Sequence, residues 1–406
     1  MTQPPPTEHK SFWQTLNRPI AALLALQLMA GILLAPHFSF FPLYIKELGY
    51  STILIANIVA AKQIAGLIAS LVGGSLSDSL GRKRTLLLGN LGYLLSSFAF
   101  LIVSPNWIGL LWAISGFGLG LHTLGGQSYL MDAATPNYLG LISALFNWGY
   151  TLGGALGSPI AGLLLDRGGY STLAWAMIAF SLCTIVVNQF ILPSSPVERK
   201  PRPPGLKRLF GYADIATQPT ILTLAALRFL PTIYYAATLI LIPLLLDAAG
   251  ASKTAIAWYA TVSWMMASLA QAAVGRAADR WNLKSTTAIT FAVLLISAFC
   301  TGLWPDNLWA VIIFGTMGAA AAWSLSTLLP SLVAQATVPE KCGRVLGFLH
   351  LWWNFAMIVG SMAAGALFEI ARGLPFFVAG FVNIFSIVLL VVFYRLVAQS
   401  RQVQRT

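Results

Sequence analysis

Twelve apolar runs, each close to or above 20 residues, dominate the sequence. The hydrocarbon core of a bilayer is about 30 Å thick, and a helix needs roughly 20 apolar residues to cross it. Only 9% of the 406 residues are charged, compared with about 25% in soluble domains. We therefore expect an all-α membrane protein with twelve transmembrane helices. The runs cover residues 19–45, 52–74, 85–103, 107–131, 139–165, 171–193, 218–246, 253–275, 285–304, 308–333, 343–370 and 374–397.

The Lys and Arg residues predict how these helices are oriented. If the N-terminus is cytoplasmic, four of the 24 fall on the outer side: Lys46, Arg167, Lys253 and Arg372. Two lie inside runs, and the remaining 18 are cytoplasmic, which is a strong positive-inside bias. We therefore expect a multi-pass protein of the plasma (inner) membrane with both termini cytoplasmic. The net charge of +12 belongs to its loops, and no nucleic-acid partner is expected.

A long polar stretch, rich in proline and cations, separates the sixth run from the seventh and is typical of a solvated linker. We expect an N-terminal tail at 1–18, a six-helix bundle at 19–193, the linker at 194–217, a second six-helix bundle at 218–397 and a C-terminal tail at 398–406.

The two halves of the sequence repeat. Gly250 lies 201 positions after Gly49, and further along the offset is 203, as for Gly365 after Gly162. Because both halves begin on the cytoplasmic side, we expect parallel repeats related by an axis along the membrane normal.

A charged hairpin connects the second and third runs. It contains Gly74, Asp78, Gly81, Arg82 and Lys83, and a weaker copy in the second half keeps Gly275, Asp279 and Arg280. Together with the repeat, this pattern resembles the G-x-L-x-D-x-x-G-R-K/R signature of the major facilitator superfamily. The resemblance implies a transporter with two pseudo-symmetric bundles, in which the hairpins latch the cytoplasmic side shut in the outward-facing state. The alternative is that their charges only set the orientation of the helices.

The fifth run carries a second pattern, formed by Gly153, Gly154, Gly157, Pro159 and Gly162. It resembles the glycine and proline motif of the drug/proton antiporter branch of the same superfamily, which implies proton-coupled export. Small residues also let helices pack closely, and this is the alternative interpretation. The fourth run lacks the arginine of that branch, so the route of proton coupling stays open.

Two cations, Lys62 and Arg228, lie inside apolar runs. Charges within the membrane are costly and commonly functional, although long side chains can also extend to the membrane surface. No carboxylate lies at the middle of a run, and Asp132, at the end of the fourth, comes closest. A cavity with two cations and no central acid favours anions or neutral amphiphiles over cations.

Further polar and aromatic residues share helical faces in both halves. The candidate substrate cavity comprises His37, Lys62, Asn147, Arg228, Thr232, Tyr235, His350 and Asn354. Polar stripes through Asn147 and through His350 occupy equivalent positions in the two halves, as surfaces at a central substrate site would. Hydrogen bonding between helices is the alternative. Proton coupling would use Asp132, His37 or His350.

The sequence thus predicts a secondary active transporter that works by alternating access. No enzyme activity, metal site or cofactor is expected, because the sequence has no His, Cys, Asp or Glu cluster with ligand spacing and no G-x-x-x-x-G-K-[ST] loop. The expected partners are a small-molecule substrate, protons and the lipid bilayer, and the protein is expected to be a monomer. The first expectation is proton-coupled export of a small amphipathic or drug-like compound. Uptake or exchange of an organic anion and a transport-inactive membrane receptor are the alternatives.

Overall fold

The structure, a computed structural model, describes residues 17–134, 139–194 and 212–403. The helices before the expected linker are α2 (Arg18–Ser39), α3 (Phe41–Glu47), α4 (Thr52–Leu80), α5 (Arg82–Ser97), η1 (Phe98–Leu101), α6 (Pro105–Ala133), α7 (Leu139–Val186) and η3 (Val187–Ile191). Those that follow are α9 (Ala213–Ala216), α10 (Pro219–Ala248), α11 (Lys253–Arg280), α12 (Leu283–Leu303), α13 (Leu308–Ala336), α14 (Pro339–Ile370) and α15 (Leu374–Val403). Most of the expected linker and N-terminal tail lies outside the described residues.

Ten helices of the described part are long and apolar enough to cross a membrane. One of them, α7, consists of two helices that meet at Gly169, where φ is 66°. The long helix α11 is not among the ten, and counting it brings the crossings into agreement with the twelve that the sequence predicts. The all-α membrane fold is therefore confirmed.

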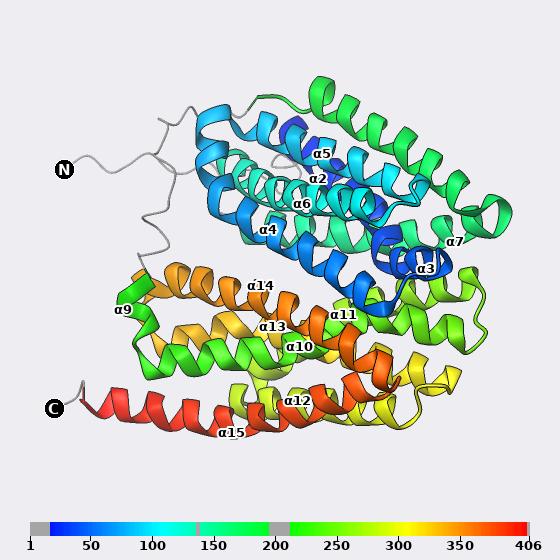
Figure 1. The fold of residues 1–406 in the computed structure, drawn as a ribbon. Coiled ribbons are helices and arrows are strands. Elements are labelled where there is room, and N and C mark those ends of the chain that lie inside the picture. The colour runs from blue at the N-terminus through cyan, green and yellow to red at the C-terminus, as the bar shows by residue number, and fades with distance from the viewer. Residues whose placement is uncertain (1–16, 135–138, 195–211, 404–406) are drawn as a thin grey trace, which may run out of the picture.

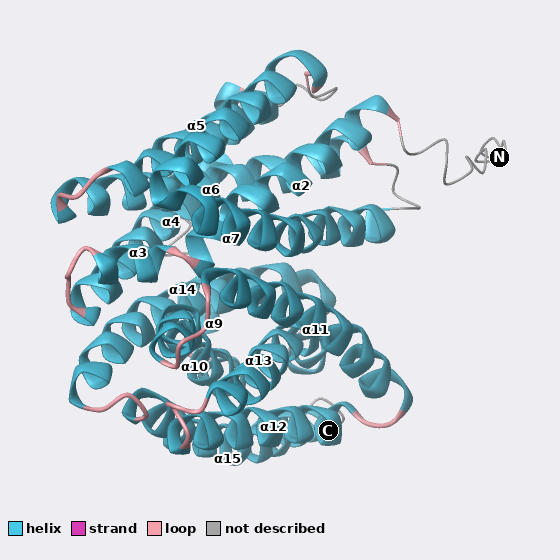
Figure 2. Cartoon of the chain, turned by 90° about the vertical axis from the view of Figure 1, so that its right-hand side faces the viewer, coloured by secondary structure: helices cyan, strands magenta, loops and turns pink. Residues whose placement is uncertain are grey.

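The helices lie in two groups (Figure 1). The N-terminal group runs from α2 to η3 and the C-terminal group from α9 to α15, and α4 and α14 pack together where the groups meet. Figure 2 shows the same two groups after a quarter turn. We name the two ends of the helix bundles after turns that lie there. The Gly81 side carries the turn between α4 and α5 and the end of α15, and the Gly49 side carries the turn between α3 and α4 and the one at Gly250. The bundle boundaries at 19–193 and 218–397 stay a prediction.

The turns on the Gly49 side show the sequence repeat in three dimensions. Gly49 and Gly250, each at φ 84°, occupy the left-handed region that glycine adopts without strain. Each turn is followed by a serine that begins the next helix, Ser51 before α4 and Ser252 before α11. Each hydroxyl accepts a hydrogen bond from the backbone N–H three residues on, at 3.3 and 3.1 Å. The same local sequence therefore begins α4 and α11 in the same way.

Glycines of the fifth run bring α7 against α2. A Cβ added at Gly153 would lie 2.9 Å from the Cα of Gly31, and one at Gly157 would lie 2.8 Å from the Cα of Ile32. Both distances are shorter than real Cβ contacts, so these positions require glycine as long as the helices stay this close. Within the N-terminal group, these two glycines of the motif therefore serve close helix packing.

Candidate substrate pocket and gates

A pocket with a cavity volume of about 80 Å³ lies where α2 meets α10, α11 and α13. Aromatic rings and small hydroxyls line it, together with aliphatic side chains and no charged residue. The lining comprises Phe38, Ser39, Tyr235, Thr238, Leu239, Ile242, Pro243, Ile256, Tyr259, Ala260, Ser263, Trp264, Ala267, Ala319 and Trp323. The ring centroids of Phe38 and Trp264 are 6.1 Å apart, so the pocket joins the two groups of helices. Such a lining suits a compound with an apolar aromatic body and a few polar groups.

Lys62 lies behind this pocket rather than in its lining. Its Nζ is 5.1 Å from the ring centroid of Phe38 and 4.9 Å from that of Trp112, and the residue is 5% exposed. Gly116 lets α6 approach α4 at this point, because a Cβ there would collide with the carbonyl of Lys62. Within the described residues, no carboxylate pairs with this cation. Lys62 is therefore held by aromatic faces, which attract cations electrostatically.

Arg228 occupies a comparable setting in the C-terminal group. Its guanidinium carbon lies 5.9 Å from the ring centroid of Trp353, and one terminal nitrogen donates a hydrogen bond to Ser326. Its Nε is buried and has no hydrogen-bond partner among the described residues. His350 stacks on the same indole at 5.3 Å. The structure thus brings two of the expected cavity residues together on one tryptophan.

His37 forms the matching contact in the N-terminal group. Its ring lies 4.8 Å from that of Trp112, the tryptophan that also faces Lys62, and Nδ1 donates a hydrogen bond of 2.8 Å to the carbonyl of Leu33. His37 is 3% exposed and does not line the pocket. Each group therefore holds one cation and one histidine against one tryptophan.

The other expected cavity residues are more scattered. Tyr235 lines the pocket. Thr232 donates its hydroxyl hydrogen to the carbonyl of Arg228 at 2.7 Å, and the Asn354 amide donates to that of His350 at 2.9 Å, so both bond within their own helix. Asn147 is exposed on α7.

The hairpin at Gly81 bonds within its own group of helices. Gly81 has φ 88°, which permits the sharp turn from α4 into α5. Arg82 donates to Asp132 at 3.1 Å, and their side chains are only 6% and 1% exposed. Arg82 also donates to Ser77 at 3.0 Å, and Lys83 to a backbone carbonyl of η3 at 2.7 Å. Asp132, an expected proton carrier, is therefore an ion-pair partner in this conformation.

The second copy of the hairpin begins in the last turns of α11. Gly275 lies there with the exposed side chains of Asp279 and Arg280. Gly74 and Asp78 lie on α4, but the Asp78 side chain falls outside the described part.

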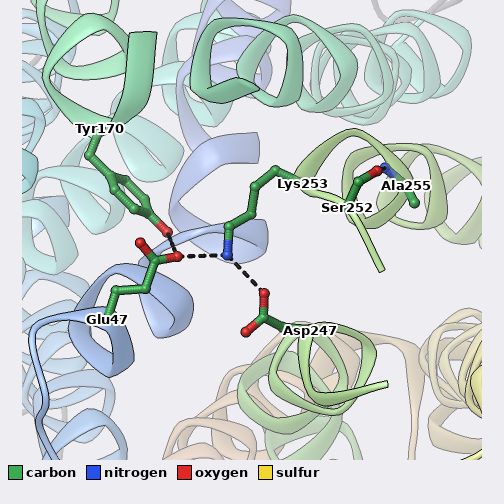
Figure 3. Close-up of polar contacts among 6 residues, drawn as sticks. All are labelled: Glu47, Tyr170, Asp247, Ser252, Lys253 and Ala255. Carbon is green, nitrogen blue, oxygen red and sulfur yellow. Dashed lines mark hydrogen bonds and ion pairs between the residues drawn. The ribbon is translucent and has the colours of Figure 1, made fainter. Parts of the chain in front are cut away.

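The Gly49 side joins the two groups through a charged cluster (Figure 3). Lys253 of α11 pairs with Glu47 of α3 at 2.6 Å and with Asp247 of α10 at 2.8 Å. Tyr170 donates its hydroxyl hydrogen to the same Glu47 carboxylate at 3.2 Å. Because Glu47 belongs to the N-terminal group and Lys253 to the C-terminal group, this cluster holds the Gly49 side together.

Two further contacts on this side follow the sequence repeat. Glu369, at the end of α14, accepts a hydrogen bond of 2.6 Å from the backbone N–H of Thr52, the first residue of α4. Its equivalent in the first half, Asp166 of α7, accepts a hydrogen bond from the Thr254 hydroxyl in the first turn of α11. An anion at the start of a helix is favoured by the helix dipole. Each half thus supplies an acid to the start of a helix in the other half.

A glycine precedes each of these acids by four residues, which places it on the same helical face. A Cβ at Gly365 would lie 2.9 Å from the carbonyl oxygen of Thr52, and one at Gly162 would lie 2.7 Å from the Cβ of Ala257. The acids and these glycines, Gly162 with Asp166 and Gly365 with Glu369, are together called the paired clamps. At the paired clamps, α14 therefore crosses α4 and α7 crosses α11 in close contact.

A buried polar cluster of the N-terminal group was missed by the sequence reasoning. His122 of α6 lies between Asn90 of α5 and Gln27 of α2, and its two ring nitrogens are each 3.0 Å from an amide oxygen. All three side chains are buried, His122 being 2% exposed. The available signal was that each of three apolar runs carries a histidine or a carboxamide: Gln27, Asn90 and His122.

Comparisons with known proteins agree with this architecture. The model of the Major Facilitator Superfamily matches residues 20–250 and 224–405. The Quinolone resistance protein NorA of Staphylococcus aureus is 24% identical over 369 residues, which is 86% of this chain and 90% of NorA. The Multidrug resistance protein MdtH of Edwardsiella ictaluri is 21% identical over 370 residues, covering 87% of this chain and 89% of MdtH.

Solved structures share the fold at low sequence identity. The nucleoside transporter NupG superposes with a TM-score of 0.79 at 14% identity and covers 94% of this chain and 100% of its own. A D-xylose-proton symporter superposes with a TM-score of 0.71 at 14% identity and covers 93% and 96%. The superfamily is made of transporters rather than enzymes. The resemblance drawn from the hairpin is thereby confirmed, and the chain belongs to the major facilitator superfamily.

Proposed function

We propose that the protein exports a small amphipathic, drug-like compound across the plasma (inner) membrane in exchange for protons. The pocket between α2 and the C-terminal helices is the observation that carries this proposal, because its rings and hydroxyls suit an aromatic amphiphile. The names of NorA and MdtH, which refer to quinolone and multidrug resistance, support the same substrate class.

In this proposal the Gly81 side is cytoplasmic and both termini lie there, in keeping with the positive-inside bias. The cluster at Lys253 and the paired clamps then close the outer side, and the conformation is inward-facing. The units 19–193 and 218–397 rock about the pocket in a monomer. In the outward-facing state the hairpins at Asp78 and Asp279 close the cytoplasmic side.

The proposal is tested with the full chain in proteoliposomes, with norfloxacin as an intrinsically fluorescent probe. Vesicles with an acidic lumen should accumulate norfloxacin faster and to a higher level than vesicles without a gradient. Protein-free liposomes under the same gradient correct for passive entry. Equal accumulation with and without the gradient rules out proton coupling. Flux no greater than in protein-free liposomes contradicts export of this class and favours a receptor.

Exchange of an organic anion is the second candidate, and it rests on Lys62 and Arg228. Neither cation has a carboxylate partner within the described residues, and the orphaned Nε of Arg228 leaves a donor free for an anionic group. Arg228→Ala should slow transport of a carboxylate-bearing compound more than transport of its neutral methyl ester. Ser326→Ala, which removes the hydroxyl partner but keeps the charge, is the matched control. Equal loss for acid and ester contradicts the electrostatic role.

A further inference from the structure

The His122 cluster is arranged as it would be around a protonated ring. Both ring nitrogens face oxygen atoms, Nδ1 that of Asn90 and Nε2 that of Gln27, at 3.0 Å each. Amide oxygens only accept hydrogen bonds. A neutral imidazole carries one N–H and therefore satisfies one of the two contacts, whereas the imidazolium ion donates to both.

The cluster can also complete its hydrogen bonds when the ring is neutral. If either amide turns about its side-chain bond, it presents an NH2 group in place of its oxygen. Asn90 is suited to this change, because its Nδ2 is buried and has no partner in the present arrangement. After the turn this nitrogen donates to the bare nitrogen of His122. Gain or loss of a proton thus needs an amide rotation and leaves no new ring nitrogen unsatisfied.

Among the described residues, no charged side chain forms a hydrogen bond or ion pair with the cluster. The charged residues at the Gly81 end of the three helices are six to ten positions away: Arg18 before Gln27, Arg82, Lys83 and Arg84 before Asn90, and Asp132 after His122. At about 1.5 Å per residue, these spacings correspond to roughly 9 to 15 Å along the helices. They also show that the three cluster residues lie at a similar depth.

Further titratable neighbours lie on α5, α4 and α7, the one on α7 being Tyr150, which interacts electrostatically with Tyr93. Tyr93 is in ring contact with His122 at 5.4 Å, and its buried hydroxyl has no partner among the described residues. Lys62 of α4 packs against α6 at Gly116, six residues from His122 toward the Gly49 side. Tyr93 is neutral over the physiological range and Lys62 is a turn and a half distant. The two amides therefore form the polar surroundings of the ring.

Gln27 connects the cluster to the parts of the molecule that a transport cycle moves. It lies on α2, whose opposite end carries Phe38 of the pocket. A Cβ at Gly149 of α7 would lie 3.6 Å from the Cβ of Gln27, so α7 packs directly on this residue. Helix α2 thus carries both a partner of His122 and part of the pocket lining, and a displacement of α2 against α6 would change the distance between the Gln27 amide and His122.

We propose that His122, held between Gln27 and Asn90, is a proton-binding site that takes up and releases one proton in each transport cycle. The proton binds to the lone pair of one ring nitrogen, and the new N–H donates to the facing amide oxygen. Its release is accompanied by rotation of one amide. This role rests on the proton coupling proposed above, and it assigns the coupling to a residue absent from the expected carriers Asp132, His37 and His350.

Proton binding can be measured directly, because the chain has only four histidines: His9, His37, His122 and His350. We would record 15N spectra of the full chain, labelled at histidine and held in lipid nanodiscs, and assign each signal by single substitution to Gln. The His122 signals should change from neutral imidazole to imidazolium within the range of about pH 5 to 8 in which histidine titrates. A single neutral tautomer throughout that range overturns the proposal.

Coupling is tested separately with norfloxacin in proteoliposomes. In His122→Gln, the stimulation of norfloxacin uptake by a pH gradient should be at least tenfold smaller than in the wild type. The variant should keep the counterflow that is measured without a gradient. His9→Gln, which changes a histidine outside the apolar runs, is the control and should keep the stimulation. If His122→Gln keeps it, the role of His122 is wrong while proton-coupled export stands. If the wild type ignores the gradient, both proposals fail.

Discussion

The paired clamps predict how the equilibrium between the conformations with a closed and an open Gly49 side responds when a clamp acid loses its charge. Glu369→Gln keeps the shape of the side chain but replaces the carboxylate that accepts from Thr52 at 2.6 Å. Hydrogen bonds to charged groups contribute about 1.5 to 3 kcal/mol, and exposed ionic contacts about 0 to 1 kcal/mol. Because Glu369 is exposed and Gln still accepts a hydrogen bond, we expect Glu369→Gln to destabilise the closed Gly49 side by about 1 kcal/mol.

Asp166→Asn removes the equivalent charge in the other clamp, next to Thr254. The two acids share no partner, so their effects should add and give about 1 to 2 kcal/mol for the double variant. Since 1.4 kcal/mol is a factor of ten, the population with an open Gly49 side should rise about 5- to 30-fold.

Distances between spin labels would measure this shift. Labels at Asn106→Cys and Ala371→Cys, both exposed on the Gly49 side and in different groups, are introduced after Cys183, Cys300 and Cys342 are replaced by serine. In the double variant, the fraction of molecules with a longer distance between the two labels should increase. Asp306→Asn is the control, because Asp306 pairs with Arg372 inside the C-terminal group at 2.5 Å. An unchanged distribution in the double variant, or an equal shift in the control, refutes the reasoning.

Three further predictions concern the clamp glycines, the pocket and α9. Gly365→Ala should lengthen the same spin-label distance, because its Cβ would lie 2.9 Å from a carbonyl oxygen of α4, whereas Gly154→Ala, with its nearest atom at 3.8 Å, should leave that distance unchanged. Trp264→Ala should raise the KM for norfloxacin about 2- to 10-fold, since aromatic contacts contribute about 0.5 to 1.5 kcal/mol, and an unchanged KM would exclude this ring from binding. Hydrogen bonds from Arg344 lower the pKa of Asp214, so the contact stabilises the fold above the ordinary carboxylate range and loses this effect as the pH falls. The Tm difference between wild type and Asp214→Asn should therefore be larger at pH 7 than below about pH 3, and a constant difference would contradict the linkage.

The arrangement of the helices could be predicted from the sequence because each crossing leaves a long apolar run. The two helices of α7 meet at Gly169, where φ is 66°, and this break lies between the runs 139–165 and 171–193 that the sequence predicts. Lys62 is buried in protein because a small residue of another helix, Gly116, allows α6 to approach, and this contact could not be predicted from one run alone.

The candidate site was harder to predict, because it depends on which helix faces meet. His37 shares a helix with Phe38, yet only Phe38 reaches the pocket, and the two residues differ by one position on the helix. His122 was missed for the same reason. Its partners lie 95 and 32 residues away in the sequence, and no spacing within one helix indicates that they converge.

The paired clamps also bear on how such a chain can arise. The first helix of α7, near its end at Asp166, meets the start of α11. The end of α14, which corresponds to that first helix, meets the start of α4, which corresponds to α11. An interface in which patch A contacts patch B while B contacts A is isologous, the pattern of a twofold homodimer. A six-helix ancestor with one acid and one glycine at these positions would have paired with a copy of itself through both contacts. The present chain keeps that self-complementary surface inside a single polypeptide.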